Sequence, residues 1–467
     1  MLRAKPYQFG KWINSLVMMD IISLGVCFLL ATELNGYTFA TGHITLGDAL
    51  LLIACFMICL NTIGAYEINR DMSSLRYASE HALAMGAMLV IVFITTYGIL
   101  SYNESIKPAR SVYLLTFILV TPLSLLYRYN HSVHVAKKSA ARVFYVIGTS
   151  ELTRQLQAIC QQAHFLYPMQ LIHVTTQKDG RSERQEPEST HAGAEGLLRE
   201  VLTQKPKQCE GVIIDLSTCE LNAKLSELLL AVDLHSLPVY PVELFVETFF
   251  HKIDLSHVTL ACALDGTFIA DHQKAYGKLK SLVEGFLAGL LFLTLLPLLF
   301  IIALIIKLED FGPILFTQER VGRFEKPFLV YKFRSMSVHN ESDSPLYTAT
   351  SDSRITKFGR ILRLMRLDEL PQLWNVIRGE MSIIGPRAEW SKLVEQYQQL
   401  IPYYHLRHLV KPGITGWAQV NYGYGGSLDD TLEKLQYDLY YVKHYSLLMD
   451  ASIVLKTIFT MLSASGR

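Results

Sequence analysis

Four long apolar runs open the chain, and polar segments separate them. The runs cover roughly residues 12–32, 44–64, 82–100 and 111–127. Each holds about 17–21 residues, the length that a helix needs to cross about 30 Å of hydrocarbon. The pattern therefore predicts a domain of four transmembrane helices within residues 1–135. A cleavable signal peptide is not expected, because the first run is followed by three more without a small-residue cleavage site.

Lysine and arginine flank these runs unevenly. Cations precede the first run and follow the second and the fourth, whereas the segment between the first two runs contains none. Because cytoplasmic loops are enriched in Lys and Arg, both ends of the four-helix domain are expected to face the cytoplasm. The cations that indicate this are Arg3, Lys5, Lys11, Arg70, Arg76, Arg128, Lys137, Lys138 and Arg142, with Lys107 and Arg110 as a weaker signal in the opposite sense.

Residues 140–272 alternate strand-like runs, such as RVFYVIG and GVIIDLS, with helical stretches. That alternation predicts a parallel α/β domain of Rossmann-like type in the cytosol. The turn after the first strand is Gly148-Thr149-Ser150, which lacks the full GxGxxG pattern of a dinucleotide site. A structural or regulatory domain is therefore favoured, and a working nucleotide site is the alternative.

A fifth apolar run, at residues 283–306, opens the last domain, which extends over 275–467. Pro297 lies at its centre, where it removes a helical hydrogen bond and kinks the helix. Lys280 precedes the run and Lys307 follows it, so cations flank both ends. We interpret the run as a re-entrant helix that breaks at Pro297 and returns to the cytoplasmic face. The alternative is an ordinary kinked spanning helix.

The composition agrees with a membrane protein. Half of the 467 residues are hydrophobic and the mean hydropathy is +0.24, both high for a soluble protein. A net charge of +1 argues against bulk binding of nucleic acid, so any basic character must be local. The 7 cysteines form no CxxC or Cys/His ligand spacing, which argues against disulfide frameworks and structural zinc.

Two adjacent carboxylates, Asp368 and Glu369, are the main candidates for chemistry. They follow a run of cations that includes Arg363, and Pro371 places them near a helix break. A carboxylate can attack phosphorus and form an acyl phosphate. One or two carboxylates together with substrate phosphates also form the usual magnesium site, so Asp368 and Glu369 are candidate ligands of a Mg²⁺ cofactor. The other role open to Glu369 is to orient Asp368. The alternative is an acidic pair at a helix end, neutralised by nearby arginines.

Further cations precede and follow this pair. Arg320, Lys332 and Arg334 lie on short strand-like segments, and Arg387 lies on a Gly-Pro turn. Arginine forks and lysine charges suit phosphate oxygens, so these residues and Arg363 are candidate phosphate ligands. A further apolar stripe, at Trp390, Leu393, Tyr397, Leu400 and Tyr404, predicts either a core face or a helix in the membrane interface.

Several segments closely resemble one known family over residues 275–467. They are KFRSM, RLDELPQLWNV, GEMSIIGPR, KPGITGWAQVN and DLYYVKHYSLLMD, and they resemble the bacterial sugar transferases, the polyprenyl-phosphate glycosylphosphotransferases. Together with the four-helix start and the Rossmann-like middle, the chain is similar to the long monotopic phosphoglycosyl transferases that initiate exopolysaccharide synthesis.

This resemblance implies a reaction in two steps. Asp368 would attack the β-phosphate of a UDP-sugar and release UMP, and undecaprenyl phosphate would then collect the sugar phosphate. Glu369 matches the family's second carboxylate, with Mg²⁺ as cofactor. Lys332, Arg363 and Arg387 match its phosphate-contacting cations, and Pro297 matches its re-entrant breakpoint. The implied location is the bacterial inner membrane, with multiple passes and the catalytic domain on the cytoplasmic face.

The departures from the family pattern are modest. Glu380 stands where the family usually has aspartate, and Ala388 stands where a proline is common. The expected partners are the UDP-sugar, undecaprenyl phosphate and membrane lipid, with no nucleic acid. The apolar surfaces permit a homodimer, and contacts with other polysaccharide assembly proteins are a further expectation.

Three competing functions are weaker. A glycosyltransferase that moves only the sugar often has an Asp-x-Asp metal motif, and none follows Lys307. A membrane scaffold or regulator has no need of the intact Asp368-Glu369 pair. A polytopic transferase needs acidic residues on loops between many spans, and too few spans follow residue 130. Neither the sugar nor the role of residues 1–270 can be read from the sequence.

Overall fold

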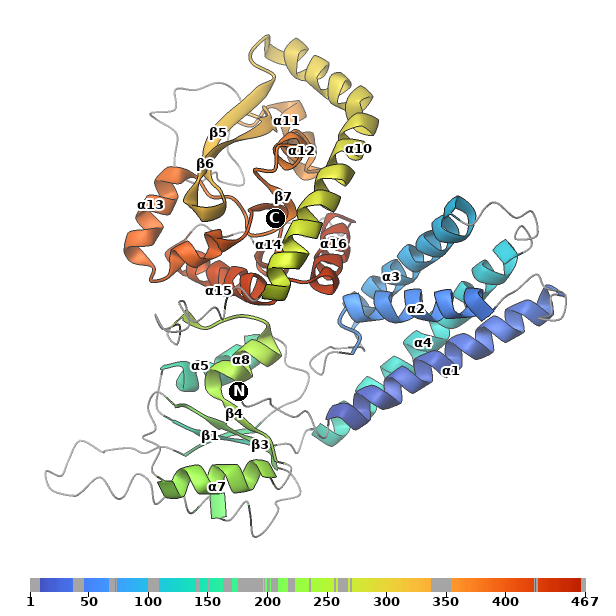
Figure 1. Ribbon diagram of the computed structural model, residues 1–467, viewed down its shortest axis with the longest axis vertical. Coiled ribbons are helices and arrows are strands. Elements are labelled where there is room, and N and C mark those ends of the chain that lie inside the picture. The colour runs from blue at the N-terminus through green and yellow to red at the C-terminus, as the bar shows by residue number, and fades with distance from the viewer. Residues whose placement is uncertain are drawn as a thin grey trace, which may run out of the picture. The chain divides into compact units, whose positions relative to one another are not determined.

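The computed structural model describes most of the chain, in two compact units, Met1–Phe250 and His251–Arg467 (Figure 1). Of the cations that predict the orientation, Arg3, Lys5, Arg70, Lys107 and Arg142 lie outside the described residues. Apart from a few single residues, the described ranges are 9–36, 46–66, 74–99, 109–139, 143–148, 151–162, 170–174, 209–216, 223–234, 237–255, 271–336, 354–423 and 427–462.

The four predicted N-terminal helices all form. They are α1 (Phe9–Leu34), α2 (Leu46–Thr62), α3 (Leu75–Phe93) and α4 (Ala109–Ser139), and α3 continues into a π-helical turn, η2 (Ile94–Ile99). α1 packs against α4, and α3 packs against both α2 and α4. By length and composition α1, α3 and α4 could each cross a membrane, whereas the apolar segment of α2, Ala49–Thr62, is shorter. The helices therefore support membrane insertion, although α2 is shorter than its predicted 44–64 run.

A buried ion pair joins α1 to α4. Arg128 Nη2 lies 2.5 Å from Asp20 Oδ2, and neither side chain is exposed. Tyr66 and Tyr127 also donate their hydroxyls to Asp20, and Arg128 Nη1 donates to the carbonyl of Ala65 at 2.9 Å. Arg128 was counted among the cations that follow the fourth apolar run, but its side chain is buried, so the orientation rests on the other cations and stays a prediction. α4 extends well beyond residue 127, and the Asp20 carboxylate allows the guanidinium to stay inside the helical bundle.

The second part of this unit contains a four-stranded parallel sheet in the order β2-β1-β3-β4. Its strands are β1 (Val143–Ile147), β2 (Gln170–Val174), β3 (Cys209–Ile214) and β4 (Val239–Pro241). The helices are α5 (Glu151–Gln162), α7 (Ala223–Leu234) and α8 (Val242–Phe250). The predicted parallel α/β arrangement is thus present, and a Rossmann-like relationship stays a prediction.

The strands alternate their side chains between two apolar layers. Phe144 and Val146 pack with α5 and α8 on one face, whereas Ile147 and Val212 pack with α7 on the other. At the carboxyl end of β1, Gly148 has a positive φ of 149°, and a Cβ there would lie 2.4 Å from the Cβ of Asp215. This glycine therefore allows β1 and β3 to end in close contact, which is a structural reason for its presence.

The second unit begins with the longest helix, α10 (Asp271–Asp310), of 40 residues. A hairpin follows, made of β5 (Leu315–Val321) and β6 (Pro327–Phe333). The remaining elements are α11 (Lys357–Leu364), η7 (Leu367–Glu369), α12 (Gln372–Ile377), β7 (Ser382–Ile384), α13 (Ser391–Leu400), η8 (Tyr404–Leu409), β8 (Gly413–Thr415), α14 (Trp417–Asn421), α15 (Leu428–His444) and α16 (Leu447–Leu462).

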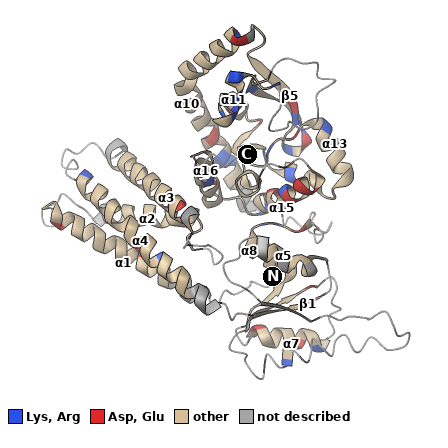
Figure 2. Cartoon of the chain, turned by 180° about the vertical axis from the view of Figure 1, so that it is seen from behind, with Lys and Arg blue, Asp and Glu red and all other residues tan. Residues whose placement is uncertain are grey.

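The helix α10 is continuous through Pro297, and Figure 1 shows that it is bent. The proline thus lies within one helix, as the kinked form of the prediction requires, and the re-entrant path stays a prediction. Its inward residues Ala288, Leu299 and Ile302 belong to the cores formed with β6, α11 and α12. Outward residues such as Phe286 and Phe300 are exposed, and Figure 2 shows few charged residues along the length of α10.

A separate core lies between α13, η8 and α15. Leu393, Tyr397 and Tyr404 are buried in it together with Leu435 and Leu439. The apolar stripe that begins at Trp390 is therefore chiefly a core face. An exposed apolar surface occurs instead on α16, at Leu447, Leu448, Val454, Ile458 and Met461.

Candidate active site

The two adjacent carboxylates lie in a short helical turn between two helices. α11 is capped at its start by Thr356, whose hydroxyl accepts a hydrogen bond from Gly359 N at 2.9 Å. It ends before Arg366, which has a left-handed backbone with φ 54°. Because a non-glycine residue rarely adopts this conformation, the chain turns sharply here. Asp368 and Glu369 then occupy the 3₁₀ turn η7, so the predicted helix break at the pair is present.

Glu369 is buried among cations. Its Oε1 lies 2.9 Å from Lys332 Nζ and 3.3 Å from Arg387 Nη2, and its Oε2 lies 3.9 Å from Arg366 Nη1. Burial alone would raise the pKa of Glu369, but the charges of Lys332, Arg387 and Arg366 outweigh it and hold this pKa well below its usual value. Glu369 is therefore a fixed anion at neutral pH.

The pKa of Asp368 is shifted in the opposite direction to that of Glu369. Burial raises its pKa, and the negative charge of Glu369 raises it further, while Lys332 and Arg363 oppose the shift only in part. Neighbouring carboxylates whose pKa values are driven apart have different roles. Asp368 is therefore the more basic of the two carboxylates, as a candidate nucleophile should be, whereas Glu369 stays ionised among its cations.

Three cations border a small recess next to Glu369. Arg320, Lys332 and Arg387 line it, with Val330, Gln372, Met381, Ala388 and Gly413 as the other lining residues. Burial lowers the pKa of Lys332 although Glu369 acts in the opposite sense, whereas the charge of Glu369 raises the pKa of Arg387. Arg320 donates to the carbonyl of Ala388 at 3.0 Å, which turns its guanidinium toward the Arg387 segment. Arginine forks and lysine charges of this kind suit anionic oxygens, so the three cations stay candidate phosphate ligands.

The other two candidate phosphate ligands occupy different places. Arg363 acts on Asp368 through its charge, and its buried Nη1 has no hydrogen-bond partner among the described residues. An unpaired buried donor close to the acidic pair suits an anionic ligand. The guanidinium of Arg334 lies against Gly312, where it fills the space that a Cβ would occupy. The structure thus brings Arg320, Lys332, Arg363 and Arg387 close to the acidic pair, and the role of Arg334 stays a prediction.

Two charged residues that the sequence analysis did not single out hold the Arg387 segment. Buried Arg407 donates from Nη2 to the carbonyl oxygen of Arg387 at 2.9 Å and to Asp438 Oδ2 at 2.7 Å. A signal for Asp438 was present, because it shares a buried helix face with Leu435 and Leu439. A carboxylate on an apolar stripe needs a partner. No spacing in the sequence identifies Arg407 as that partner.

The candidate protein ligands for a metal ion at this site are the two adjacent carboxylates. Within the described part of the chain, no group of three or more His, Cys, Asp or Glu side chains could hold a metal. Asp368 and Glu369 Oε2 are oxygen donors of the kind that Mg²⁺ prefers, while Glu369 Oε1 is taken by Lys332 and Arg387. These residues fit a Mg²⁺ ion that draws its other ligands from substrate phosphates and water.

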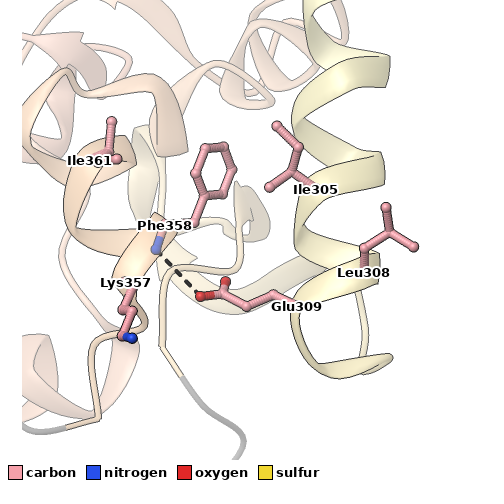
Figure 3. Close-up of a pocket in the computed structure, with 6 residues that line it drawn as sticks. All are labelled: Ile305, Leu308, Glu309, Lys357, Phe358 and Ile361. Atoms are coloured by element: carbon pink, nitrogen blue, oxygen red, sulfur yellow. Dashed lines mark hydrogen bonds between the residues drawn. The ribbon is translucent and has the colours of Figure 1, made fainter.

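A shallow groove lies between the end of α10 and the start of α11 (Figure 3). Its walls are the apolar side chains of Ile305, Leu308, Phe358 and Ile361, with Lys357 and Glu309 as the polar residues. Glu309 accepts a hydrogen bond from Phe358 N at 3.3 Å, drawn as the dashed line. The end of α10 is thus tied to the helix that leads to Asp368.

Similar proteins carry the same region. Residues 275–464 match the family model described as bacterial sugar transferase. A UDP-N-acetylgalactosamine-undecaprenyl-phosphate N-acetylgalactosaminephosphotransferase of Aeromonas hydrophila is 38% identical over 260 residues, which cover 55% of this chain and 60% of that protein. A UDP-glucose:undecaprenyl-phosphate glucose-1-phosphate transferase of Escherichia coli K12 is 49% identical over 186 residues, which cover 39% of each chain. The chain thus matches less than two thirds of the length of either relative.

A shorter relative is covered almost completely. The exopolysaccharide production protein PSS of Rhizobium leguminosarum bv. phaseoli is 42% identical over 178 residues, which cover 37% of this chain and 88% of that protein. The fold and the site define a protein with helices suited to a membrane and an acidic pair beside a cationic recess. The chain belongs to the bacterial sugar transferase family.

Proposed function

We propose that the chain transfers a sugar 1-phosphate from a UDP-sugar to undecaprenyl phosphate and releases UMP. The observation that carries the proposal is the acidic pair. Glu369 is held as an anion between Lys332 and Arg387, and the adjacent Asp368 has a raised pKa. The names of the relatives from Aeromonas hydrophila and Escherichia coli support the substrate classes, and the Rhizobium relative supports a place in exopolysaccharide production.

In the first step, Asp368 attacks the β-phosphorus of the UDP-sugar. A bond forms between a carboxylate oxygen and phosphorus, and the bond from the β-phosphorus to the bridging oxygen breaks. UMP leaves with the bridging oxygen, and the sugar phosphate stays on Asp368 as an acyl phosphate. Arg320, Lys332 and Arg387 bind the diphosphate oxygens in the recess, where charge develops on the leaving group.

In the second step, an oxygen of undecaprenyl phosphate attacks the same phosphorus. The bond to Asp368 breaks, the carboxylate is regenerated, and an undecaprenyl-diphosphate sugar leaves. Arg363, with its buried unpaired Nη1, binds the incoming phosphate. Mg²⁺ held by Asp368 and Glu369 Oε2 would neutralise phosphate charge when bound.

Contacts at the two ends of α10 support a re-entrant path for this helix. Near its start, Lys280 lies 2.7 Å from Asp450 Oδ2 of α16, and near its end Glu309 bonds to Phe358 N of α11. A spanning helix has its ends on opposite sides of about 30 Å of hydrocarbon. Because one compact unit contacts both ends, a path that enters and leaves on the cytoplasmic face fits better. There the UDP-sugar is available, and the exposed apolar face of α10 meets lipid.

The N-terminal helices anchor the chain in the bacterial inner membrane in this proposal. The α/β part has a structural or regulatory role on the cytoplasmic side. A homodimer and contacts with other polysaccharide assembly proteins complete the expected partners. The Aeromonas and Escherichia relatives differ in the sugar that their names specify, so the sugar of this chain has to be measured.

The test is UMP release from a panel of UDP-sugars by membranes that carry the wild-type chain. With undecaprenyl phosphate and Mg²⁺ supplied, we expect release with one sugar, loss on chelation of Mg²⁺, and at least about a thousandfold loss in Asp368→Asn. The matched control is Asp429→Asn, which changes an exposed aspartate of α15. Release of UDP in place of UMP would indicate a glycosyltransferase and exclude the covalent step. No turnover with any sugar overturns the proposal.

A further inference from the structure

An asparagine outside the acidic pair bonds to an open strand edge. Asn375 of α12 is fully buried. Its Nδ2 donates to the carbonyl oxygen of Leu329 at 2.7 Å, and its Oδ1 accepts from Tyr331 N at 3.2 Å. Leu329 and Tyr331 are two residues apart on β6, so these backbone groups point to the same side of the strand. Among the described strands, only β5 pairs with β6, so the other edge of β6 has no neighbouring strand. The carboxamide of Asn375 bonds to the backbone groups of this open edge in place of a strand.

A nearby carboxylate determines how this carboxamide is oriented. Asn375 Nδ2 also donates to Glu380 Oε2 at 2.8 Å, and Arg378 Nη2 lies 3.2 Å from Glu380 Oε1. An ionised carboxylate only accepts hydrogen bonds, so the Nδ2 atom must face it. Both amide hydrogens and one oxygen lone pair of Asn375 are thereby used. Glu380 is one of the positions at which this chain departs from the family pattern, and its longer side chain makes this contact.

These contacts connect the two segments that form the centre of the site. Lys332 directly follows Tyr331 on β6, and Glu369 lies three residues before the start of α12. The position of α12 on the edge of β6 therefore sets the 2.9 Å separation between Lys332 Nζ and Glu369 Oε1. We propose that Asn375 and Glu380 are positioning residues that hold Lys332 and the acidic pair in register for the donor phosphates. The proposal rests on the proposed transferase function.

The first variant is Asn375→Asp, which is nearly isosteric but lacks both amide hydrogens. The new carboxylate faces Glu380 and the carbonyl oxygen of Leu329, so both contacts become repulsive. We expect kcat/KM for the UDP-sugar to fall about 10- to 100-fold, because small displacements of aligned groups have effects of this size. The same substitution at Asn421 is the control, since its amide bonds to Trp417 O and Lys456 in α14 and α16.

A double-mutant cycle with Lys332→Ala tests whether Asn375 acts through Lys332. We expect the double variant Asn375→Asp/Lys332→Ala to lose about as much activity as Lys332→Ala alone, whereas Asn421→Asp/Lys332→Ala should show multiplied losses. If the activity losses of Asn375→Asp and Lys332→Ala also multiply in the double variant, the positioning role is overturned. The double variant Asn375→Asp/Glu380→Gln restores one donor opposite the new carboxylate, and we expect it to recover part of the activity. No recovery contradicts the role of Glu380.

Amide hydrogen exchange at Tyr331 tests the contact without any substrate. We expect faster exchange in Asn375→Ala, which removes the oxygen that accepts from Tyr331 N, than in wild type, and unchanged exchange overturns the proposed pairing. Failure of the transferase function gives a different result, because wild-type membranes then release no UMP while the Tyr331 exchange still responds to Asn375→Ala. If wild-type membranes are active but the losses from Asn375→Asp and Lys332→Ala multiply, the transferase function is supported and only the positioning role is excluded.

Discussion

Arg407 donates from Nη2 to the backbone carbonyl oxygen of Arg387 at 2.9 Å. The buried guanidinium thus fixes the main chain of the residue whose side chain reaches Glu369. Its own position is set by Asp438 Oδ2 at 2.7 Å and by the hydroxyl of Tyr404 at 2.6 Å. Asp438 of α15 is in this way linked through Arg407 and Arg387 to the recess next to Glu369, and the titration of Asp438 can be followed.

The first prediction concerns the pH dependence of stability in Asp438→Asn. Burial raises the pKa of Asp438 to about 6 from 3.8, even though Arg407 and Lys434 oppose the shift, and Glu389 adds to it. Between about pH 4 and 6 the folded state binds this proton more tightly than the unfolded chain. The contribution of Asp438 to stability therefore decreases as pH rises through this interval, by on the order of 3 kcal/mol.

Urea unfolding of the detergent-solubilised protein at several pH values measures this effect. Because Asp438→Asn cannot titrate, the difference in unfolding free energy between wild type and variant should change between pH 4 and 6 and stay level above pH 7. Asp429→Asn, in an exposed position of the same helix, is the control. A difference that stays constant over the whole range contradicts the raised pKa.

The second prediction concerns the acid limb of activity. Asp368 must be ionised to attack phosphorus, so activity should be lost as pH falls through its raised pKa. The charge of Arg363 lowers this pKa, and Arg363→Gln should therefore shift the acid limb of kcat/KM to higher pH. Arg360→Gln, on the exposed side of α11, should leave the limb in place. Equal acid limbs in wild type and Arg363→Gln would show that Arg363 does not act on Asp368.

The third prediction is that Glu369→Gln loses both activity and stability. The substitution leaves Lys332 and Arg387 without the anion that they share. Removing one partner from such buried contacts typically costs about 1–3 kcal/mol. Because the pKa of Glu369 is depressed, its stabilising effect is present at neutral pH and is lost as pH falls below about 4.3, the usual value for glutamate. Wild type and Glu369→Gln should therefore differ in unfolding free energy at pH 7 and converge under acid conditions. A difference that persists in acid contradicts this account.

The contacts around the acidic pair show which parts of the site could be predicted from sequence patterns. Asp368, Glu369, Lys332 and Arg387 are close in space, as expected from motifs on separate segments. Arg334 lies two positions after Lys332 and should share its face of the strand, but β6 ends at Phe333. Beyond this end the alternation no longer applies, and the guanidinium of Arg334 turns toward Gly312.

Ion pairs between residues far apart in the chain could not be predicted from the sequence. The lengths of the apolar runs predicted the N-terminal helices and the position of α10. Asp20 and Arg128 pair across a long segment of chain, and each alone is only a charge inside or beside an apolar run. The same holds for Arg407 and Asp438. Such contacts depend on how helices pack, which hydropathy does not determine.

The fourth prediction concerns the ion pair inside the N-terminal helices. Asp20→Ala leaves the buried guanidinium of Arg128 without its counter-charge, and leaves the Tyr66 hydroxyl with only the weak acceptor Met57 Sδ. We expect a loss of about 3–5 kcal/mol in the stability of this helical domain. Thermal unfolding in detergent micelles, followed by size-exclusion chromatography, measures it.

Removal of both charges separates the cost of an unpaired ion from the value of the pair. Asp20→Leu/Arg128→Met replaces two buried charges by apolar side chains, and such replacements are often neutral or stabilising. We therefore expect the double variant to be more stable than Asp20→Ala and close to wild type. A double variant as unstable as Asp20→Ala would mean that the Tyr66 and Tyr127 contacts to Asp20, rather than charge compensation, hold α1 against α4.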